Sequence, residues 1–218
     1  AGLTAVDEQG QNDGTYVNAV TRSVEGALLG DADTAAEFGG STDYVNLGNM
    51  ASLSANRMTF GCWLRADAWA CSWPRIMSRA SSKNWSDRHW ELMVTPQRKL
   101  MLTLRVGNTI YEMEGQTTLQ LGQWCFVVCV FNRNTQRIRL YLNGERDAGW
   151  DGVVDAGLND TDTIEAWIGD CPTVPGQCPW EGPIDEVFII TGRALTPPEV
   201  KELYEDSIPN VKIVSWDN

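Results

Sequence analysis

The sequence predicts an all-β protein, a two-sheet antiparallel jelly-roll sandwich with one short helix near its C-terminal end. Apolar residues alternate with a period of two along most of the chain, and the strand-like runs are short and separated by turn signals. Only one segment carries the start signals of a helix. No linker-like stretch divides residues 1–218, so the chain is interpreted as a single domain of about ten strands.

The clearest predicted strands show this alternation directly. Along residues 58–65 and 99–106, every second side chain is apolar and faces one side. The run 137–142 alternates in the same way and stops at Asn143-Gly144, a strong hairpin turn. Residues 124–131 are apolar at almost every position, which predicts a central strand covered on both sides. Further strands are expected at residues 36–38, 44–47, 76–78, 89–94, 164–168 and 184–190.

The single predicted helix begins at Thr196. Thr196 is an N-cap residue, two prolines occupy the first turn, and Glu199 completes a capping box. Val200, Leu203 and Tyr204 then fall on one face, so the helix should pack against the sandwich through that face.

The charge of the chain excludes some classes of partner. The sequence has 17 basic and 29 acidic residues, a net charge of −12. This balance repels nucleic-acid backbones and anionic membranes, and no apolar run approaches the roughly 20 residues that a membrane helix needs. Neither nucleic acid nor membrane insertion is therefore expected.

Two of the six cysteines bracket a short, turn-rich loop. Cys171 and Cys178 are separated by Pro-Thr-Val-Pro-Gly-Gln, which has no helix or strand signal. This spacing predicts a small loop disulfide. Two free thiols, or half of a metal site, are the alternatives.

The other four cysteines give weaker signals. Cys125 and Cys129 lie in one predicted strand, where four residues span roughly 13 Å, so they cannot bridge each other and are interpreted as small buried apolar residues. Cys62 has a similar setting and Cys71 lies in a loop, and a bridge between these two has weak support. The mixed usage favours an oxidising compartment.

Several segments resemble one family when they are read in order. The opening Asp7-Glu-Gln-Gly-Gln-Asn-Asp-Gly-Thr-Tyr16 is followed by motifs at residues 35–47, 58–65, 122–131, 139–144 and 182–196, the last containing Gly-Pro-Ile-Asp-Glu-Val. Together they resemble the laminin-G-like jelly rolls of the concanavalin A-like lectin/glucanase superfamily, particularly a bacterial and phage subgroup. This fold serves lectins, adhesion modules, polysaccharide-degrading enzymes and virion surface proteins, so function must be argued from the site.

The sequence lacks the catalytic patterns expected of enzymes with this fold. Glycosidases need two carboxylates flanking the scissile bond, and those of this superfamily usually carry them at alternate positions of one strand. Asp185 and Glu186 are adjacent and should point to opposite faces. The only histidine, His89, lies among aromatic and charged residues and is interpreted as packing or surface. The chain is therefore predicted not to be an enzyme. A polysaccharide lyase or hydrolase with an unrecognised site is an alternative.

The resemblance also implies a structural calcium ion. In the family, the opening loop and the Ile-Asp-Glu-Val strand come together and often hold one Ca²⁺. The resemblance therefore implies Asp7 and Asp185 as carboxylate ligands, with Asn12 and backbone carbonyls such as that of Thr15 completing the ligand shell. Oxygen donors from irregular loops suit Ca²⁺. The alternative is that Asp7 caps a turn and Asp185 pairs with an arginine.

Tryptophans in polar loops supply the candidate ligand-binding residues. Flat rings beside hydrogen-bonding side chains match the apolar faces and polar rims of sugars. The predicted contacts are Trp69, Trp73, Trp85, Asp87, Arg88, Trp150 and Trp180. Packing against the sheet, or a protein interface, would use the same rings.

These observations favour a non-catalytic carbohydrate-binding module, extracellular or on a virion surface, whose partner is a glycan or polysaccharide. The alternative is a structural or decoration protein of a virion or cell surface. Its Trp-rich loops would contact sister subunits in a homo-oligomer, or virion neighbours.

Overall fold

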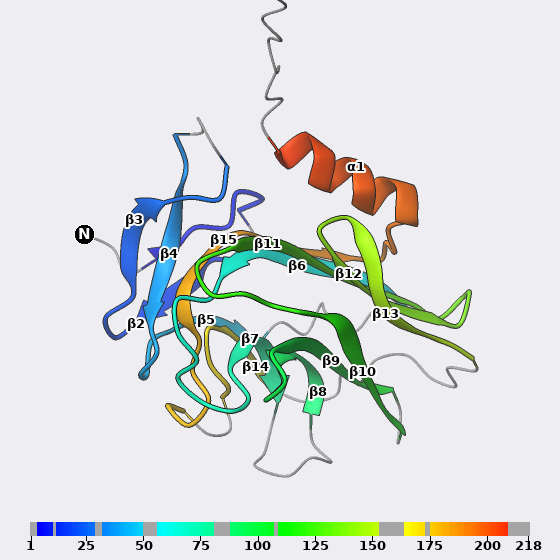
Figure 1. Cartoon of the computed structure of the whole chain (residues 1–218), viewed down its shortest axis with the longest axis horizontal. Helices are drawn as coiled ribbons and strands as arrows, with labels where there is room; N and C mark the ends of the chain where they lie inside the picture. Colours follow the sequence, from blue (N-terminus) through cyan, green and yellow to red (C-terminus); the bar gives the residue numbers. More distant parts are fainter. Residues whose placement is uncertain are drawn as a thin grey trace, which may run out of the picture.

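The computed structural model describes residues 4–10, 12–28, 32–49, 56–80, 88–106, 109–152, 164–172 and 175–208. They form two antiparallel sheets, which face each other across one core, and one helix, which lies outside the sandwich (Figure 1). The predicted jelly-roll sandwich with a late helix is confirmed.

The larger sheet, called sheet A, has eight strands. Their order across the sheet is β1 (Thr4–Ala5), β2 (Gly14–Val17), β5 (Tyr44–Asn49), β14 (Glu165–Ile168), β7 (Arg75–Ala80), β8 (Arg88–Val94), β9 (Lys99–Val106) and β10 (Thr109–Thr118).

The second sheet, called sheet B, has seven strands. Their order is β13 (Glu145–Asp151), β12 (Arg137–Leu142), β11 (Trp124–Asn132), β6 (Arg57–Arg65), β15 (Glu181–Thr191), β4 (Thr34–Gly39) and β3 (Thr21–Glu25). All predicted strands are present, and β1, β2, β3, β10 and β13 are additional. Strands β1, β2 and β3 were missed because they are short, and β13 was missed because charged residues occupy much of its length.

The core lies between the inner faces of the two sheets. It includes Leu100, Leu102 and Leu104 of sheet A, and Val127, Cys129 and Phe131 of sheet B. Strand β11 also carries a second apolar row, Phe126, Val128 and Val130, on the outer face of sheet B. The prediction that this strand is covered on both sides is therefore confirmed.

Helix α1 (Pro197–Ser207) covers that outer row of sheet B (Figure 1). Its Val200 is buried there, and the Tyr204 ring lies 5.7 Å from Trp63 and 6.1 Å from Phe126, between ring centroids. The Glu199 carboxylate accepts hydrogen bonds of 2.7 Å from both the backbone N–H and the hydroxyl of Thr196. The predicted helix start is thus confirmed, because Glu199 satisfies the N-cap N–H.

The hairpin between β12 and β13 turns at Asn143-Gly144, as predicted. Both residues have positive φ, 50° and 78°, the left-handed conformation that a two-residue hairpin turn requires. The Asn143 side chain also accepts a 2.9 Å hydrogen bond from the Phe126 backbone N–H, which ties the turn to β11.

Three cysteines are part of the sandwich interior. Cys62, Cys125 and Cys129 are buried in the core, and burial raises the pKa of each thiol. Cys125 and Cys129 share the inner face of β11 as free thiols, in agreement with the expectation that they do not bridge each other. Within the described chain, no helix has the length and apolar character needed to cross a membrane.

Candidate functional site

The outer face of sheet A is polar, unlike the outer face of sheet B. Residues that pair directly on neighbouring strands share a face, and Glu91 of β8 pairs with Thr103 of β9, which pairs with Glu112 of β10. Leu92 and Leu102, one position along, belong to the core. The row from Glu91 to Glu112 therefore lies on the side of sheet A that faces away from sheet B.

A buried ion pair anchors a loop to this face. The Arg75 Nε lies 3.3 Å from Glu91 Oε1, and the two side chains are only 7% and 1% exposed. Arg75 also donates through Nη1 to the backbone carbonyl of Trp73, and the Cys171 thiol donates to Glu91 over 3.6 Å. Because Arg75 holds both Glu91 and the Trp73 backbone, it fixes the end of the loop that carries Trp73.

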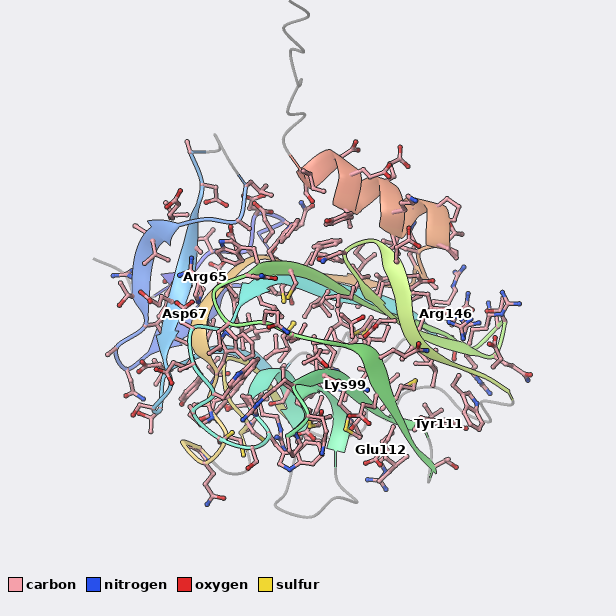
Figure 2. The ribbon with its side chains drawn as sticks, viewed as in Figure 1. Arg65, Asp67, Lys99, Tyr111, Glu112 and Arg146 are labelled. Carbon is pink, nitrogen blue, oxygen red and sulfur yellow. The ribbon has the colours of Figure 1, made fainter. Side chains whose placement is uncertain are left out.

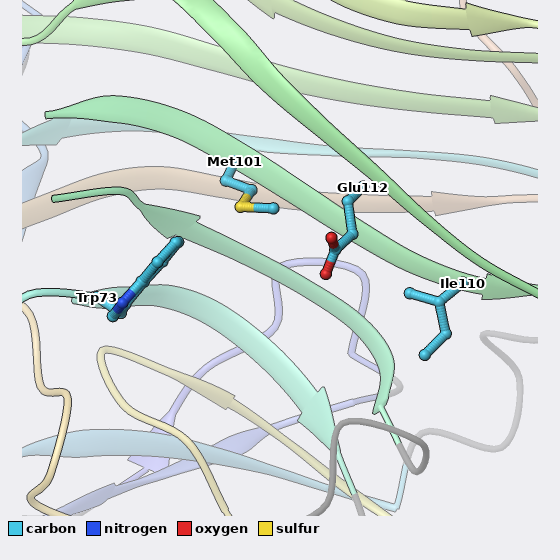
Figure 3. A pocket seen from close by; sticks show the side chains of 4 residues that line it. All are labelled: Trp73, Met101, Ile110 and Glu112. Atoms are coloured by element: carbon cyan, nitrogen blue, oxygen red, sulfur yellow. The ribbon is translucent and has the colours of Figure 1, made fainter. Parts of the chain in front are cut away.

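Residues at the β9–β10 edge of this face line an open groove of about 530 Å³. Figure 2 shows Glu112 and Tyr111 on β10, at the side of the molecule where β13 with Arg146 also lies. In the close-up of Figure 3, Met101, Glu112 and Ile110 follow one another along the sheet, and Trp73 stands at one end of this row. An indole ring, two apolar side chains and one exposed carboxylate are thus brought together.

Only Trp73 of this groove was predicted as a ligand contact. The alternation along residues 99–106 places Met101 on the face opposite Leu100 and Leu102, but the β10 segment was not predicted as a strand. The signal was present, because Tyr111 and Met113 alternate there with Glu112 and Glu114. Ile110 and Glu112 reach the groove only through the pairing of β10 with β9.

Two of the predicted ligand-binding tryptophans are packed instead. Trp180 is 1% exposed and lies in the core, so its assignment to ligand binding is wrong. Its backbone is held on both sides, by Gly169 and by Gly40, and this directs the ring inward. Trp69 packs edge-on against Trp180 with ring centroids 6.4 Å apart, and the Arg98 guanidinium lies 4.9 Å over its ring. Trp69 is therefore a packing residue whose ring already has a cationic neighbour.

Trp150 is not among the residues that line the groove. Trp150 lies on β13 of sheet B, is 46% exposed, and meets Tyr111 edge-on at 5.6 Å. Trp85 and Asp87 lie outside the described residues. Arg88 begins β8, and its side chain also lies outside the described part.

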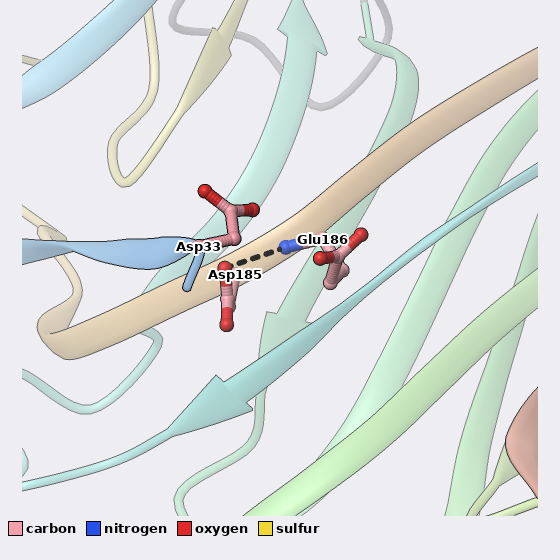
Figure 4. Close-up of side chains that lie close together, drawn as sticks. All are labelled: Asp33, Asp185 and Glu186. Carbon is pink, nitrogen blue, oxygen red and sulfur yellow. Dashed lines mark hydrogen bonds between the residues drawn. The ribbon is translucent and has the colours of Figure 1, made fainter. Parts of the chain in front are cut away.

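Asp185 has other carboxylates beside it. Figure 4 shows Asp185 with Asp33 and Glu186, and ligand oxygens of the three residues lie within 4.8 Å of one another. The buried Asp185 carboxylate accepts hydrogen bonds from the Ala27 N–H at 2.8 Å and the Glu186 N–H at 3.0 Å. Carboxylate oxygens are the donors that Ca²⁺ takes, and three close carboxylates repel one another unless a cation or protons intervene, so this set fits calcium.

Asp7, in contrast, organises its own loop. Its carboxylate accepts hydrogen bonds of 3.0 Å from the backbone N–H groups of Gln9 and Asn12, as expected for an aspartate that caps a turn. Thr15 lies on β2, paired with β1 and β5. The proposal that Asp7, Asn12 and Thr15 share a metal with Asp185 stays a prediction, and the residues that the structure gathers around Asp185 are different ones.

The loop cysteines pair differently from the sequence prediction. Cys171 is buried with its thiol directed to Glu91, and Cys178 is half-buried with its sulfur hydrogen-bonded to Cys71. The predicted Cys171–Cys178 bridge is therefore wrong for this structure, where all three are free thiols. The short spacing suggested a bridge, but the Cys171 side chain is buried against Glu91 of sheet A and is not directed toward Cys178. The weakly supported Cys62–Cys71 bridge fails for a related reason, since Cys62 points into the core.

The order of strands, the late helix and the motif-bearing strands agree with a known family. A family model, Laminin_G_3, described as concanavalin A-like lectin/glucanases superfamily, matches residues 38–201, more than half of the chain. The chain belongs to this superfamily. Among curated proteins, no sequence match was found.

Solved structures with the same fold come from several carbohydrate-active proteins. Domain 4 of AbnA, an extracellular arabinanase from Geobacillus stearothermophilus in complex with arabinotriose, matches with a TM-score of 0.68 and 19% identity over 93% of both chains. The Ruminococcus gnavus sialidase module CBM40, bound to α2,3 sialyllactose, matches with a TM-score of 0.65 and 15% identity over 78% of this chain and 96% of that one. A Trypanosoma rangeli sialidase matches at 0.68 and 14% identity, over 94% of this chain but 31% of the enzyme. At these identities, the likeness establishes the laminin-G-like fold.

Proposed function

We propose that this chain is a non-catalytic carbohydrate-binding module that holds a sugar ring in the groove on the outer face of sheet A. The observation that carries the proposal is the position of Trp73 beside Met101, Ile110 and Glu112 in one open groove. A flat indole ring can stack on the C–H face of a pyranose or furanose, while a carboxylate at the rim accepts hydrogen bonds from sugar hydroxyls.

Charge narrows the class of glycan. Glu112 is exposed at the groove and the chain carries a net charge of −12, so a polyanionic chain would meet repulsion in this groove. Neutral glycans rich in hydroxyl groups are the better match, because their hydroxyls donate to Glu112. The size of the groove suits one or two sugar rings.

The comparisons support this proposal through the fold. Two of the similar structures are a domain in complex with arabinotriose and a module bound to sialyllactose. An extracellular or virion-surface location follows as part of the same proposal, because polymeric glycans are met there.

Stacking on Trp73 gives a direct test. Replacing Trp73 by Ala should weaken binding of a glycan identified on a neutral-glycan array by about tenfold, the effect of one well-placed aromatic contact. The melting temperature should stay within a few degrees, since Trp73 is only half-buried. Affinity is measured by titration calorimetry on the folded variants.

Trp150→Ala is the matched control for that test. It removes a ring of the same size, 46% exposed, on the other sheet, and should leave glycan affinity unchanged. Loss of binding in Trp150→Ala with none in Trp73→Ala would reject the groove. Glu112→Gln should weaken binding less than Trp73→Ala, because an amide oxygen still accepts a hydrogen bond.

One observation favours a second candidate, a structural or decoration protein. The exposed ring of Trp150 is the kind of residue that protein interfaces bury. If Trp150 packs against a sister subunit, the mass from size-exclusion chromatography with light scattering should be a multiple of 24.2 kDa and fall to the monomer in Trp150→Ala. A monomeric wild type would reject this candidate.

An enzyme reading has less support. His89, the only histidine, is 1% exposed, so a polymer at the surface cannot reach it in this conformation. Incubating the protein with its array-identified glycan and analysing the products by mass spectrometry should show intact glycan. New reducing ends or unsaturated products would reject the non-catalytic assignment.

We further propose that a structural calcium ion is held by Asp33, Asp185 and Glu186. Ca²⁺ should raise the melting temperature, because only the folded state gathers the three carboxylates, which come from both ends of the chain. Asp185→Ala cannot test this alone, since Asp185 also accepts the Ala27 and Glu186 N–H groups.

Asp33→Asn is the sharper variant because Asp33 is exposed. It should abolish the calcium-dependent rise while changing the melting temperature in EDTA little. Asp7→Asn is its control. Loss of the calcium response in Asp7→Asn alone would restore the ligand set implied by the family resemblance.

A further inference from the structure

Backbone hydrogen bonds join the ends of two loops that lie far apart in the sequence, one of which carries the groove residue Trp73. The first, residues 66–74, joins β6 to β7 and contains Cys71 and Trp73, and the second, residues 169–180, joins β14 to β15 and contains Cys178. The Arg75 backbone N–H donates to the Cys178 carbonyl at 2.9 Å. At the base of the first loop, the Asp67 N–H donates to the Glu181 carbonyl at 3.0 Å.

Further backbone hydrogen bonds hold the chain just after each cysteine. After Cys71, the Pro74 carbonyl accepts a 3.0 Å hydrogen bond from the Val94 N–H, and after Cys178, the Trp180 N–H donates to Gly169 at 2.8 Å. The two backbones are therefore held at their separation by hydrogen bonds that do not involve the cysteine side chains.

The two side chains meet between these loops. The Cys71 thiol donates a hydrogen bond to the Cys178 sulfur, and both residues are half-buried. Cys62, Cys125, Cys129 and Cys171 are all buried. Of the six cysteines, Cys71 and Cys178 are therefore the two that are partly exposed to a small reagent, and they are hydrogen-bonded to each other.

We propose that Cys71 and Cys178 form a redox-sensitive disulfide site that clamps the Trp73 loop to the 169–180 loop. Because the two thiols are hydrogen-bonded to each other and the backbones near them are held by separate hydrogen bonds, side-chain rotation should be enough to close the bond. This proposal concerns the cysteines alone and does not depend on glycan binding at the groove.

The surroundings of Cys178 favour the reaction. The hydrogen bond from Cys71, with the charge of Arg75, lowers the pKa of the Cys178 thiol to about 6, while the same hydrogen bond raises the pKa of Cys71. Cys178 is then the thiolate at neutral pH, and thiolates are the attacking species in disulfide exchange. The buried core thiols have raised pKa values and are poor competitors.

The oxidant we invoke is a small-molecule disulfide such as oxidised glutathione. The Cys178 thiolate attacks one of its sulfurs, forming a mixed disulfide and releasing one glutathione thiolate. Cys71 then loses its proton and attacks the Cys178 sulfur, forming the Cys71–Cys178 bond and releasing the second glutathione. Two protein thiols are oxidised, and one glutathione disulfide is reduced to two thiols.

Peptide mapping tests the connectivity directly. The full chain is equilibrated with oxidised glutathione, alkylated without reduction and digested with trypsin. Residues 66–75 form one tryptic peptide containing Cys71, and residues 147–193 form another containing Cys171 and Cys178. These two peptides should appear linked, and fragmentation before Pro175 should place the link on Cys178. Linkage through Cys171, or separate alkylated peptides, would overturn the proposal.

Thermal melting with and without reductant gives a second, independent readout. The bond closes a loop of about 100 residues, so reducing the oxidised wild type should lower its melting temperature by about 5–15 °C. This reductant-dependent shift should vanish in Cys71→Ala and in Cys178→Ala, and persist in Cys171→Ala. Each protein is compared with itself, so a general loss of stability does not confuse the result. A shift that survives in Cys71→Ala, or vanishes only in Cys171→Ala, would overturn the assignment. If a variant fails to fold, the wild-type peptide map decides.

Discussion

The two sheets share one core but differ on their outer faces. On sheet B, the outer row includes Trp63, Phe126 and Val128, and helix α1 covers it. On sheet A, the corresponding face carries Arg75, Glu91 and Glu112, and loop residues and a groove lie over it. Among the described residues, the single helix thus packs on the apolar outer face of sheet B.

This difference indicates which face can bind a ligand. A contiguous apolar face is stabilised when another element covers it, and that element then keeps solutes away from the face. A polar face gains little from a permanent cover, so part of it can stay open for a partner. Substitutions on the two faces should therefore separate stability from binding, and the following predictions are ordered by the size of the expected effect.

The largest effect is expected under the helix. Trp63→Ala should lower the free energy of unfolding by about 4 kcal/mol, because it leaves a cavity beneath α1 where Trp63 meets Phe126 and Tyr204. Urea denaturation measures the loss. Glycan affinity of the folded fraction should be unchanged. A tenfold loss of affinity would show that the two faces are not independent.

Breaking the buried ion pair on sheet A should affect both properties. Glu91→Leu leaves the Arg75 guanidinium buried beside an apolar side chain and should cost about 3 kcal/mol of unfolding free energy. Since Arg75 also holds the Trp73 carbonyl, glycan binding should weaken as well. Adding Arg75→Met should recover part of the stability without recovering the binding. If the double variant recovered both the stability and the glycan binding in full, Arg75 would not be what anchors Trp73.

A smaller effect is expected at the hairpin of sheet B. Asn143→Ala should cost about 1–2 kcal/mol, because alanine tolerates a φ of 50° poorly and the hydrogen bond to the Phe126 N–H is lost. Chemical denaturation again gives the value, with Asn143→Gly as the control that keeps the backbone conformation. Equal losses in the two variants would assign the whole effect to the hydrogen bond.

The smallest effect is expected at the start of α1. The Thr196 N–H and hydroxyl, together with Arg193, lower the pKa of Glu199 to about 2. A lowered folded-state pKa means that the charged form stabilises the helix above pH 5, and that this contribution fades as the pH falls toward 2. Glu199→Gln should therefore melt a few degrees below wild type at pH 7, and the gap should narrow between pH 5 and 3. A gap independent of pH would show that charge at Glu199 is irrelevant.

Features that depend on neighbouring residues were predictable from the sequence. Strand β11, the Asn143-Gly144 turn and the start of α1 each follow from a few consecutive side chains. The groove does not, because Ile110 and Glu112 join Met101 through strand pairing, and Trp73 arrives from a loop. The Cys71–Cys178 contact and the Asp33–Asp185 cluster are further examples, since each joins segments from opposite parts of the chain.

Trp180 shows the opposite difficulty. Its neighbours are proline, glycine and charged residues, which suggested an exposed loop, yet its ring is buried. Polar neighbours describe the backbone's surroundings and say little about where a single large side chain points. The local composition therefore separated Trp73 from Trp180 poorly, although only one of them lines the groove.

The hydrogen bond from Arg75 to the Trp73 carbonyl also has a consequence for the kinetics of glycan binding. A ring whose loop is already anchored to Glu91 does not need to search for its bound position when a glycan arrives. Stopped-flow traces of tryptophan fluorescence should then follow a single exponential whose rate rises linearly with glycan concentration, the signature of one-step docking onto a pre-set surface.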